Sequence, residues 1–280
     1  MAYSSGGLIE ATDYNGFVAS VNALWGNGSG NRGYGQSNTL STVAATNTVT
    51  ATQWATLIAR INSMRQHQSG TNSGITQPTA GNLIEFLSTL SGQISTIDTN
   101  RLSRNVGTVQ LATANASGAW NGTVQAVREC RFTFSSANAM RYFFNAGGTI
   151  TFNTFNSSFS GNTKSNNWNT VANSASATVT PSIFWNNLTT SNFQIASFSG
   201  SGADYNLNIL RLQARLNAAP GSSTQIILRA QFDDGATDGF DSTVLGTARV
   251  DAAANGSATT FVSNTWGTPT VTNNLTVTQS

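Results

Sequence analysis

The hydrophobic period changes once along this chain, and the change limits the folds open to it. Up to about residue 100 apolar side chains recur at helical spacing, and from residue 107 onward they alternate with polar ones. Helices followed by many short strands indicate an α+β protein. We therefore expect a helical module over residues 1–104 and an antiparallel β-sandwich, jelly-roll-like, over residues 105–280, with the boundary near Arg101–Gly107.

Three helices are predicted in the first part of the chain. The first follows Thr12 and stops at Gly26, the second begins behind Thr50 and Gln53 at capping-box separation, and the third begins after Pro78–Thr79. Their apolar faces are Phe17, Val18, Val21, Leu24 and Trp25; Trp54, Leu57, Ile58, Ile61 and Met64; and Leu83, Ile84, Phe86, Leu87, Leu90, Ile94 and Ile97. The residues Trp54, Leu57, Ile58 and Ile61 are candidates for packing and assembly contacts.

The first two helices look like copies of one another. Aligning Tyr14 with Trp54 also pairs Asn22 with Asn62, and amphipathic spacing does not force a match between asparagines. The segment Gly26–Gly35 between them is rich in glycine, but its glycines lack the phosphate-binding spacing before a helix. We interpret this segment as a connector.

Two hairpins are predicted in the second part. The stronger one joins Leu210–Leu216 to Ile226–Phe232 through a turn at Pro220–Gly221, and the other joins Met140–Asn145 to Ile150–Phe155 through Gly147–Gly148. The stretch Ser160–Ser176 is polar and almost uncharged, so we expect a long surface loop. Trp168 lies inside this stretch and is a candidate for ligand binding, because an exposed aromatic ring on a loop suits a sugar.

Few side chains are available for catalysis. Charged residues make up 9% of the chain, against about 25% in an average protein, and His67, Cys130 and Lys164 are the single residues of their types. Acid–base and nucleophilic chemistry depend on such groups, so we predict that the chain is not an enzyme and binds no cofactor. The arginines are spread along the sequence without a cluster, which predicts no nucleic-acid partner.

An acidic stretch is the one candidate metal site. Asp233, Asp234, Asp238 and Asp241 supply oxygen ligands at a density that suits calcium, although the spacing is not that of an EF-hand. An Asp- and Gly-rich turn whose side chains bond the local backbone explains the same residues, and we favour that interpretation.

The amino terminus and the apolar runs bear on location. The segment MAYSSGGLIEATDYNGF has neither a basic nor an apolar signal region, and no apolar run is long enough to cross a membrane. These features predict a protein made in the cytoplasm without membrane insertion, although its wealth of Asn, Ser, Thr and Gly is typical of an extracellular surface.

Two parts of the sequence resemble a known group. ATDYNGFVASVNALWGNGSGNRGYGQ, continued by TVTATQWATLIARINSMRQHQSG, and the later AMRYFFNAGGTITF are similar to virion structural proteins of tailed bacteriophages, especially cyanophage tail and neck proteins. The resemblance implies a structural component of the virion, built as a homo-oligomer among other virion proteins. The alternative is a receptor- or carbohydrate-binding module of a tail fibre, with a host surface glycan as its ligand.

Overall fold

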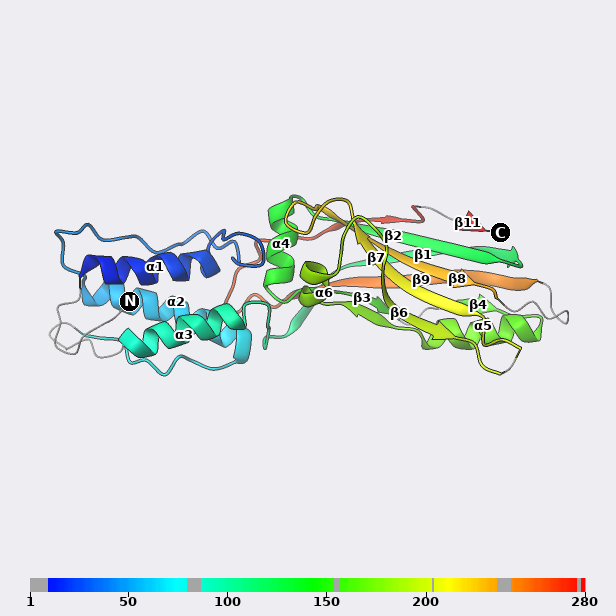
Figure 1. The fold of residues 1–280 in the computed structure, drawn as a ribbon, viewed down its shortest axis with the longest axis horizontal. Helices are drawn as coiled ribbons and strands as arrows, with labels where there is room; N and C mark the ends of the chain where they lie inside the picture. The colour runs from blue at the N-terminus through cyan, green and yellow to red at the C-terminus, as the bar shows by residue number, and fades with distance from the viewer. Residues whose placement is uncertain are drawn as a thin grey trace. The chain divides into compact units, whose positions relative to one another are not determined.

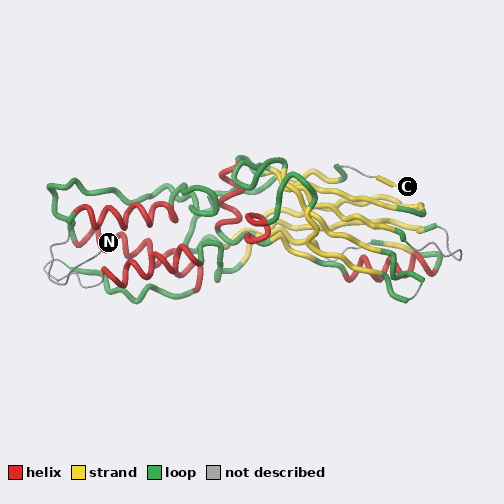
Figure 2. Tube along the Cα trace, viewed as in Figure 1, coloured by secondary structure: helices red, strands yellow, loops and turns green. Residues whose placement is uncertain are grey.

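The computed structural model describes residues 10–79, 87–153, 157–202, 204–235, 243–275 and 278–279. The chain divides into two compact units. Unit 1 contains residues 1–108, 141–147 and 257–265, and unit 2 contains residues 109–140, 148–256 and 266–280. Helices followed by antiparallel sheets confirm the α+β class (Figures 1 and 2). The sequence places segments 141–147 and 257–265 in the sandwich, whereas the structure includes them in unit 1.

Unit 1 is built on three helices, which the sequence predicts. They are α1 (Ala11–Trp25), α2 (Ala51–Ser69) and α3 (Leu87–Thr99). The capping box of Thr50 and Gln53 starts α2, and Gly26 and Gly70 follow the ends of α1 and α2. The predicted start of the third helix falls on residues 80–86, which lie outside the described residues.

The apolar faces of α1 and α2 meet through the aromatic residues that the internal repeat aligns. The rings of Tyr14 and Trp54 pack edge to face with centroids 5.1 Å apart, and Phe17 lies 6.2 Å from the same indole. The side chains of Trp54, Leu57, Ile58 and Ile61 are all fully buried. These residues therefore form the interior of unit 1.

The asparagines of the repeat hold extended chain against the helices. The Asn22 amide donates to the Leu40 carbonyl and accepts from the Leu40 N–H, each at 2.8 Å. On α2, the Asn62 carbonyl oxygen accepts from the N–H and the hydroxyl of Ser73 at 2.8 and 2.6 Å. A side-chain amide thus supplies the partner that an extended backbone otherwise finds in a neighbouring strand.

Unit 2 contains two sheets. The first has the order β1-β9-β3-β5 with β4 beside β9, and the second has the order β10-β2-β8-β7-β6 with β11 beside β2. The strands are β1 (Thr108–Gly122), β2 (Gln125–Thr133), β3 (Thr149–Asn153), β4 (Ser158–Phe159), β5 (Ala177–Val179), β6 (Phe193–Ser199), β7 (Ile209–Leu216), β8 (Gln225–Asp233), β9 (Val244–Ser257), β10 (Thr270–Asn273) and β11 (Thr278–Gln279). The further helices of the chain are α4 (Ala137–Asn145), α5 (Thr163–Ser174) and α6 (Pro181–Asn186).

The stronger predicted hairpin is confirmed. Strands β7 and β8 pair antiparallel from Ile209 opposite Asp233 to Leu216 opposite Ile226, and their alternate side chains are buried. The two sheets pack face to face, since Trp120 of β1 lies 6.0 Å from Phe232 of β8 and Arg128 of β2 bonds the Ala248 carbonyl of β9. Unit 2 is therefore sandwich-like.

The weaker predicted hairpin is wrong. The segment Met140–Asn145 belongs to helix α4, and the hydroxyl of Ser136 accepts from the Ala139 N–H at its start. Gly147, with φ of +81°, follows the helix, where its N–H donates to the Phe144 carbonyl. The apolar residues of this segment fit a helical period as well as an alternating one, and the cap decides between them.

The expected surface loop at Ser160–Ser176 is also wrong, because most of it forms helix α5. The Asn162 side chain accepts from the Ser165 N–H at 2.8 Å and caps the helix. Trp168, Val171 and Ala172 then share one buried face. Uncharged polar residues on the other face hide this helical spacing in the sequence.

Candidate functional site

His67 lies in the interior of unit 1. Its imidazole is fully buried at the end of α2, and Nε2 donates to the Ala146 carbonyl at 3.2 Å. Burial is the main cause that lowers the pKa of His67 to about 4, and the charge of Arg104 adds to it. Among the described residues no partner meets Nδ1. The ring is therefore a neutral core histidine near neutral pH, with its proton on Nε2.

Cys130 is equally enclosed in unit 2. It lies on β2 with no exposed surface. Burial, with the charges of Asp251 and Glu129, raises the pKa of its thiol to about 12. A thiol that stays protonated is a poor nucleophile.

The acidic stretch divides between two ion pairs. Asp233 pairs with Arg211 and accepts from Gln125 at 2.6 Å, whereas the buried carboxylate of Asp234 meets the buried Lys164 ammonium at 3.0 Å. Asp238 and Asp241 lie outside the described residues. Within the part of the chain that the structure describes, no group of three or more metal-ligating side chains gathers. The two described aspartates thus face cations of the protein itself.

Trp168 is a core residue rather than an exposed platform, which corrects its candidacy as a ligand-binding aromatic. Its indole is fully buried and packs against Trp120 and Phe232 with centroid separations of 5.3 and 5.8 Å. The capped helix α5 carries the ring into the interior of unit 2. No sugar reaches it there.

The segment Gly26–Gly35, interpreted as a connector, folds around a buried arginine. Arg141 donates from Nε to the Gly30 carbonyl at 3.1 Å and from Nη2 to the Arg32 carbonyl at 3.2 Å. Asn145 adds a bond to the Gly33 carbonyl at 3.0 Å. Glycines with positive φ at 28, 30, 33 and 35 bend the backbone into this ring. The sequence contains the glycines but gives no sign of the arginine that they surround.

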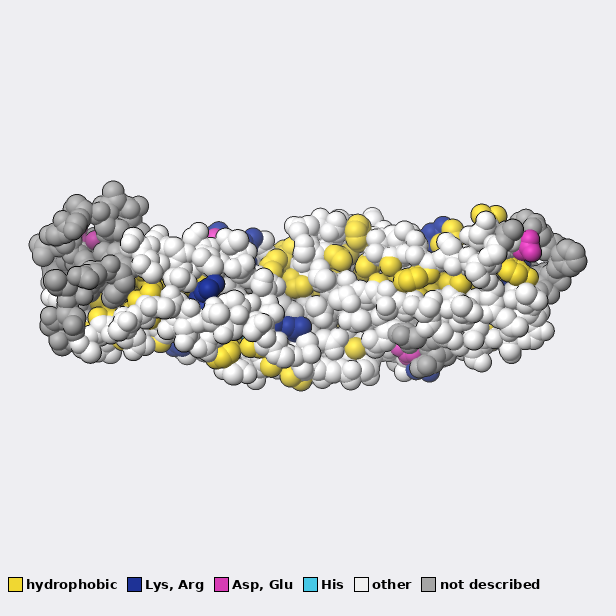
Figure 3. All heavy atoms as spheres, turned by 90° about the horizontal axis from the view of Figure 1, so that it is seen from below, with side chains coloured by type: hydrophobic (Ala, Val, Ile, Leu, Met, Phe, Trp, Pro, Cys, Tyr) yellow, Lys and Arg dark blue, Asp and Glu magenta, His cyan; other side chains and the backbone are white. Residues whose placement is uncertain are grey.

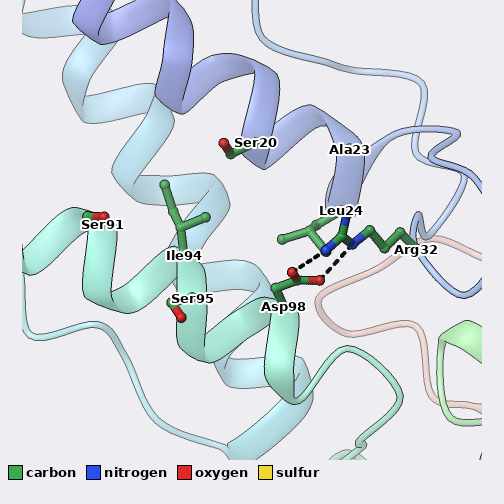
Figure 4. A pocket seen from close by; sticks show the side chains of 8 residues that line it. All are labelled: Ser20, Ala23, Leu24, Arg32, Ser91, Ile94, Ser95 and Asp98. Atoms are coloured by element: carbon green, nitrogen blue, oxygen red, sulfur yellow. Dashed lines mark hydrogen bonds and ion pairs between the residues drawn. The ribbon is translucent and has the colours of Figure 1, made fainter. Parts of the chain in front are cut away.

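A shallow groove lies between α1 and α3 on unit 1. It encloses about 350 Å³ and is lined by Ser20, Ala23, Leu24, Arg32, Ser91, Ile94, Ser95 and Asp98. Figure 4 shows the guanidinium of Arg32 facing the carboxylate of Asp98 at one end, with contacts of 2.8 and 2.5 Å. The lining holds hydroxyls and one exposed ion pair, but no nucleophile beside a base. Such a groove suits contact with another chain better than chemistry.

The outer face of the second sheet gathers arginines that the sequence leaves dispersed. Alternate positions of β2, β7 and β8 point to this face and carry Arg131, Arg211, Arg215, Arg229, Gln125, Gln213, Gln225 and Gln231. Arg215 forms a double contact with Glu129 at 2.8 and 3.0 Å. The shared strand parity of these positions was the available signal. The fold thus brings together arginines that are dispersed in the sequence.

Charged residues make up 9% of the whole chain. On the face seen in Figure 3, uncharged polar and hydrophobic side chains cover most of the described surface. None of the helices in the described ranges is long and apolar enough to cross a membrane.

No family model, no curated protein and no solved structure matches this chain.

Proposed function

We propose that this chain is a non-enzymatic structural component of a tailed-phage virion, in its tail, neck or fibre apparatus, present there in repeated copies. One observation carries the proposal: His67, Cys130 and Lys164, the scarce groups suited to catalysis, are all buried in structural contacts. A protein whose reactive groups are held inside acts through its surface. The resemblance of its sequence to virion structural proteins implies that this surface makes its contacts within a virion.

The helical unit is the proposed assembly module. The residues Trp54, Leu57, Ile58 and Ile61 stabilise its interior, so the contacts to other virion proteins or to further copies fall on its outer surface. The groove between α1 and α3 offers hydroxyls, an apolar floor at Leu24 and Ile94, and the exposed pair of Arg32 and Asp98. The apolar floor and the polar groups beside it give a partner both surface to bury and groups to bond.

Particle composition tests the proposal. Mass spectrometry of purified particles is expected to detect the chain in several copies, and antibody labelling is expected to locate it on the tail or neck. Ser95→Trp fills the groove and is expected to reduce incorporation at least about tenfold. Thr89→Trp, on α3 but outside the groove lining, is the matched control. Absence of the chain from particles, or normal incorporation of Ser95→Trp, contradicts the respective part of the proposal.

A receptor- or glycan-binding module is the second candidate function, and the arginine and glutamine rows of the second sheet favour it. Four arginines share this face with two carboxylates, Glu129 and Asp233, which leaves an excess of positive charge. Guanidinium and amide groups suit the carboxylates and hydroxyls of an acidic polysaccharide. Binding of the intact chain to polygalacturonate but not dextran, lost in an Arg131→Gln and Arg229→Gln double variant and kept in Arg249→Gln, is the expected result. Equal binding of the neutral polymer rules this candidate out.

A further inference from the structure

The chain contains one lysine, and that lysine is buried. Every other basic residue of the protein is an arginine. Where the chain buries an arginine it surrounds the guanidinium with backbone carbonyls, as Arg128 shows with Gly118 and Ala119 at 2.7 and 2.8 Å. Lys164 differs, because it is buried against a carboxylate, that of Asp234. Arginine is the usual cation for a buried pair, whereas only lysine becomes a nucleophile when it loses its proton.

The pair is enclosed by the protein. The side-chain exposures of Lys164 and Asp234 are 3% and 0%, and ions held so far from water lose their solvation. Lys164 also lies in the first turn of α5, two residues after the cap at Asn162. The positive end of a helix dipole repels a cation there.

The pair adjoins the aromatic cluster of unit 2. Trp168 follows Lys164 by one helical turn, and Phe232 of β8 lies two residues before Asp234. These two rings pack with centroids 5.8 Å apart. Hydrogen bonds also fix the chain beside each residue of the pair. The Asp234 N–H donates to the Val124 carbonyl, and the Leu245 N–H donates to Oγ of Ser165, the residue after Lys164.

We propose that Lys164 and Asp234 condense into an intramolecular amide bond between α5 and the end of β8. The ammonium first passes a proton to the carboxylate, which gives an amine and a carboxylic acid. Lys164 Nζ then attacks Cγ of Asp234, the bond from Cγ to its hydroxyl oxygen breaks, and that hydroxyl leaves with a proton from the nitrogen as one molecule of water. The two ends are held at 3.0 Å, and such positioning replaces an encounter in solution. The same dry surroundings exclude the water that would reverse the step.

Mass spectrometry of the intact full-length chain tests the bond. The wild-type protein is expected to be lighter by one water than its sequence requires, whereas Lys164→Arg, which keeps the cation and removes the amine, is expected to have its full mass. Trypsin is expected to leave the wild-type chain uncut after Lys164 and to yield a branched peptide that joins the segments around residues 164 and 234. This peptide map decides the matter even if the variant folds poorly.

Two results overturn the proposal. One is a wild-type chain of full mass that trypsin cuts after Lys164. The other is a missing water that persists in Lys164→Arg, because the Asp234–Gly235 sequence also loses a water when it closes to a succinimide. The test is independent of the virion proposal, since it concerns the covalent structure of the chain and not its location.

Discussion

Replacement of His67 by Gln is expected to remove a pH-dependent loss of stability from unit 1. The imidazole is buried as the neutral form, with Nε2 donating to the Ala146 carbonyl. Glutamine carries an N–H donor at a similar reach and does not titrate. The variant therefore keeps a donor to Ala146 and removes the ionisable group.

The size of this pH-dependent loss of stability follows from the shift in the pKa of His67. Unfolding returns the pKa of His67 from about 4 to 6.5, and each pKa unit corresponds to about 1.4 kcal/mol. The unfolded chain thus binds a proton throughout this interval while the folded chain does not, so stability falls as the pH drops from 6.5 towards 4. The full loss is about 3.4 kcal/mol, of which about 3 kcal/mol is reached by pH 4, and well above pH 6.5 this histidine contributes no pH dependence.

Urea unfolding of the wild type and of His67→Gln, with hydrogen exchange of α1, α2 and α3 as the readout of unit 1, measures the effect. Carboxylates also titrate at acid pH, but they do so in both proteins, so the difference between the two isolates His67. We expect the wild type to lose about 3 kcal/mol more than the variant between about pH 7 and pH 4. If both proteins lose stability in parallel, the imidazole is hydrated or paired in the folded state and the reasoning fails.

Three further predictions test the packing. Gly28 and Gly30 both have positive φ, but a Cβ at Gly28 overlaps the Arg32 carbonyl, whereas one at Gly30 meets open space. Gly30→Ala is therefore expected to lower the free energy of unfolding by about 1 kcal/mol, and Gly28→Ala is expected to lower it clearly more. Urea unfolding midpoints measure both changes. Trp54→Ala removes a fully buried indole and is expected to cost about 3 to 5 kcal/mol by calorimetry; a cost below about 1 kcal/mol shows an exposed site. Arg128→Met leaves the Gly118 and Ala119 carbonyls without their donor and is expected to lower stability by about 3 kcal/mol or more, while Arg249→Met, on the outer face of β9, changes it by about 1 kcal/mol or less.

Local signals were enough to predict the elements that carry their own start and stop. Thr50 and Gln53 mark the start of α2 through side-chain bonds that involve only neighbours in sequence. The hairpin of β7 and β8 shows in one run of residues both the alternation and the turn that joins it. Such elements are correct because tertiary structure selects the same conformation that the local sequence prefers.

The two wrong predictions both concern helices whose periodicity is weak in the sequence. The apolar residues of MRYFFN fit an alternating period as well as a helical one, and uncharged polar residues hide the helical spacing of Ser160–Ser176, so a strand and a loop were expected where α4 and α5 form. The deciding residues were the caps, Ser136 and Asn162, which are short polar side chains common in turns as well. A single cap bond is a weak signal in the sequence, because the helix that it starts is stabilised only when its apolar face packs into a core.

The contacts of the candidate functional residues were harder to predict than the fold, because these contacts join distant parts of the sequence. Arg141 meets carbonyls of Gly30 and Arg32 across more than 100 residues, and Lys164 meets Asp234 across 70. Neither pairing leaves a local motif. By contrast, the gathering of Arg131, Arg211, Arg215 and Arg229 follows from strand parity and needed only the order of the strands.

The buried ionisable groups of this chain take part in contacts within the protein. Burial lowers the pKa of the His67 imidazole to about 4 and raises that of the Cys130 thiol to about 12. Arg128 and Arg141 donate hydrogen bonds to backbone carbonyls, and these bonds fix loops and join strands. The arginines left at the surface lie in rows on one sheet, partly neutralised by Glu129 and Asp233. Because contacts between macromolecules rely on such rows, this face of unit 2 is a second place, besides the outer surface of unit 1, to look for a partner.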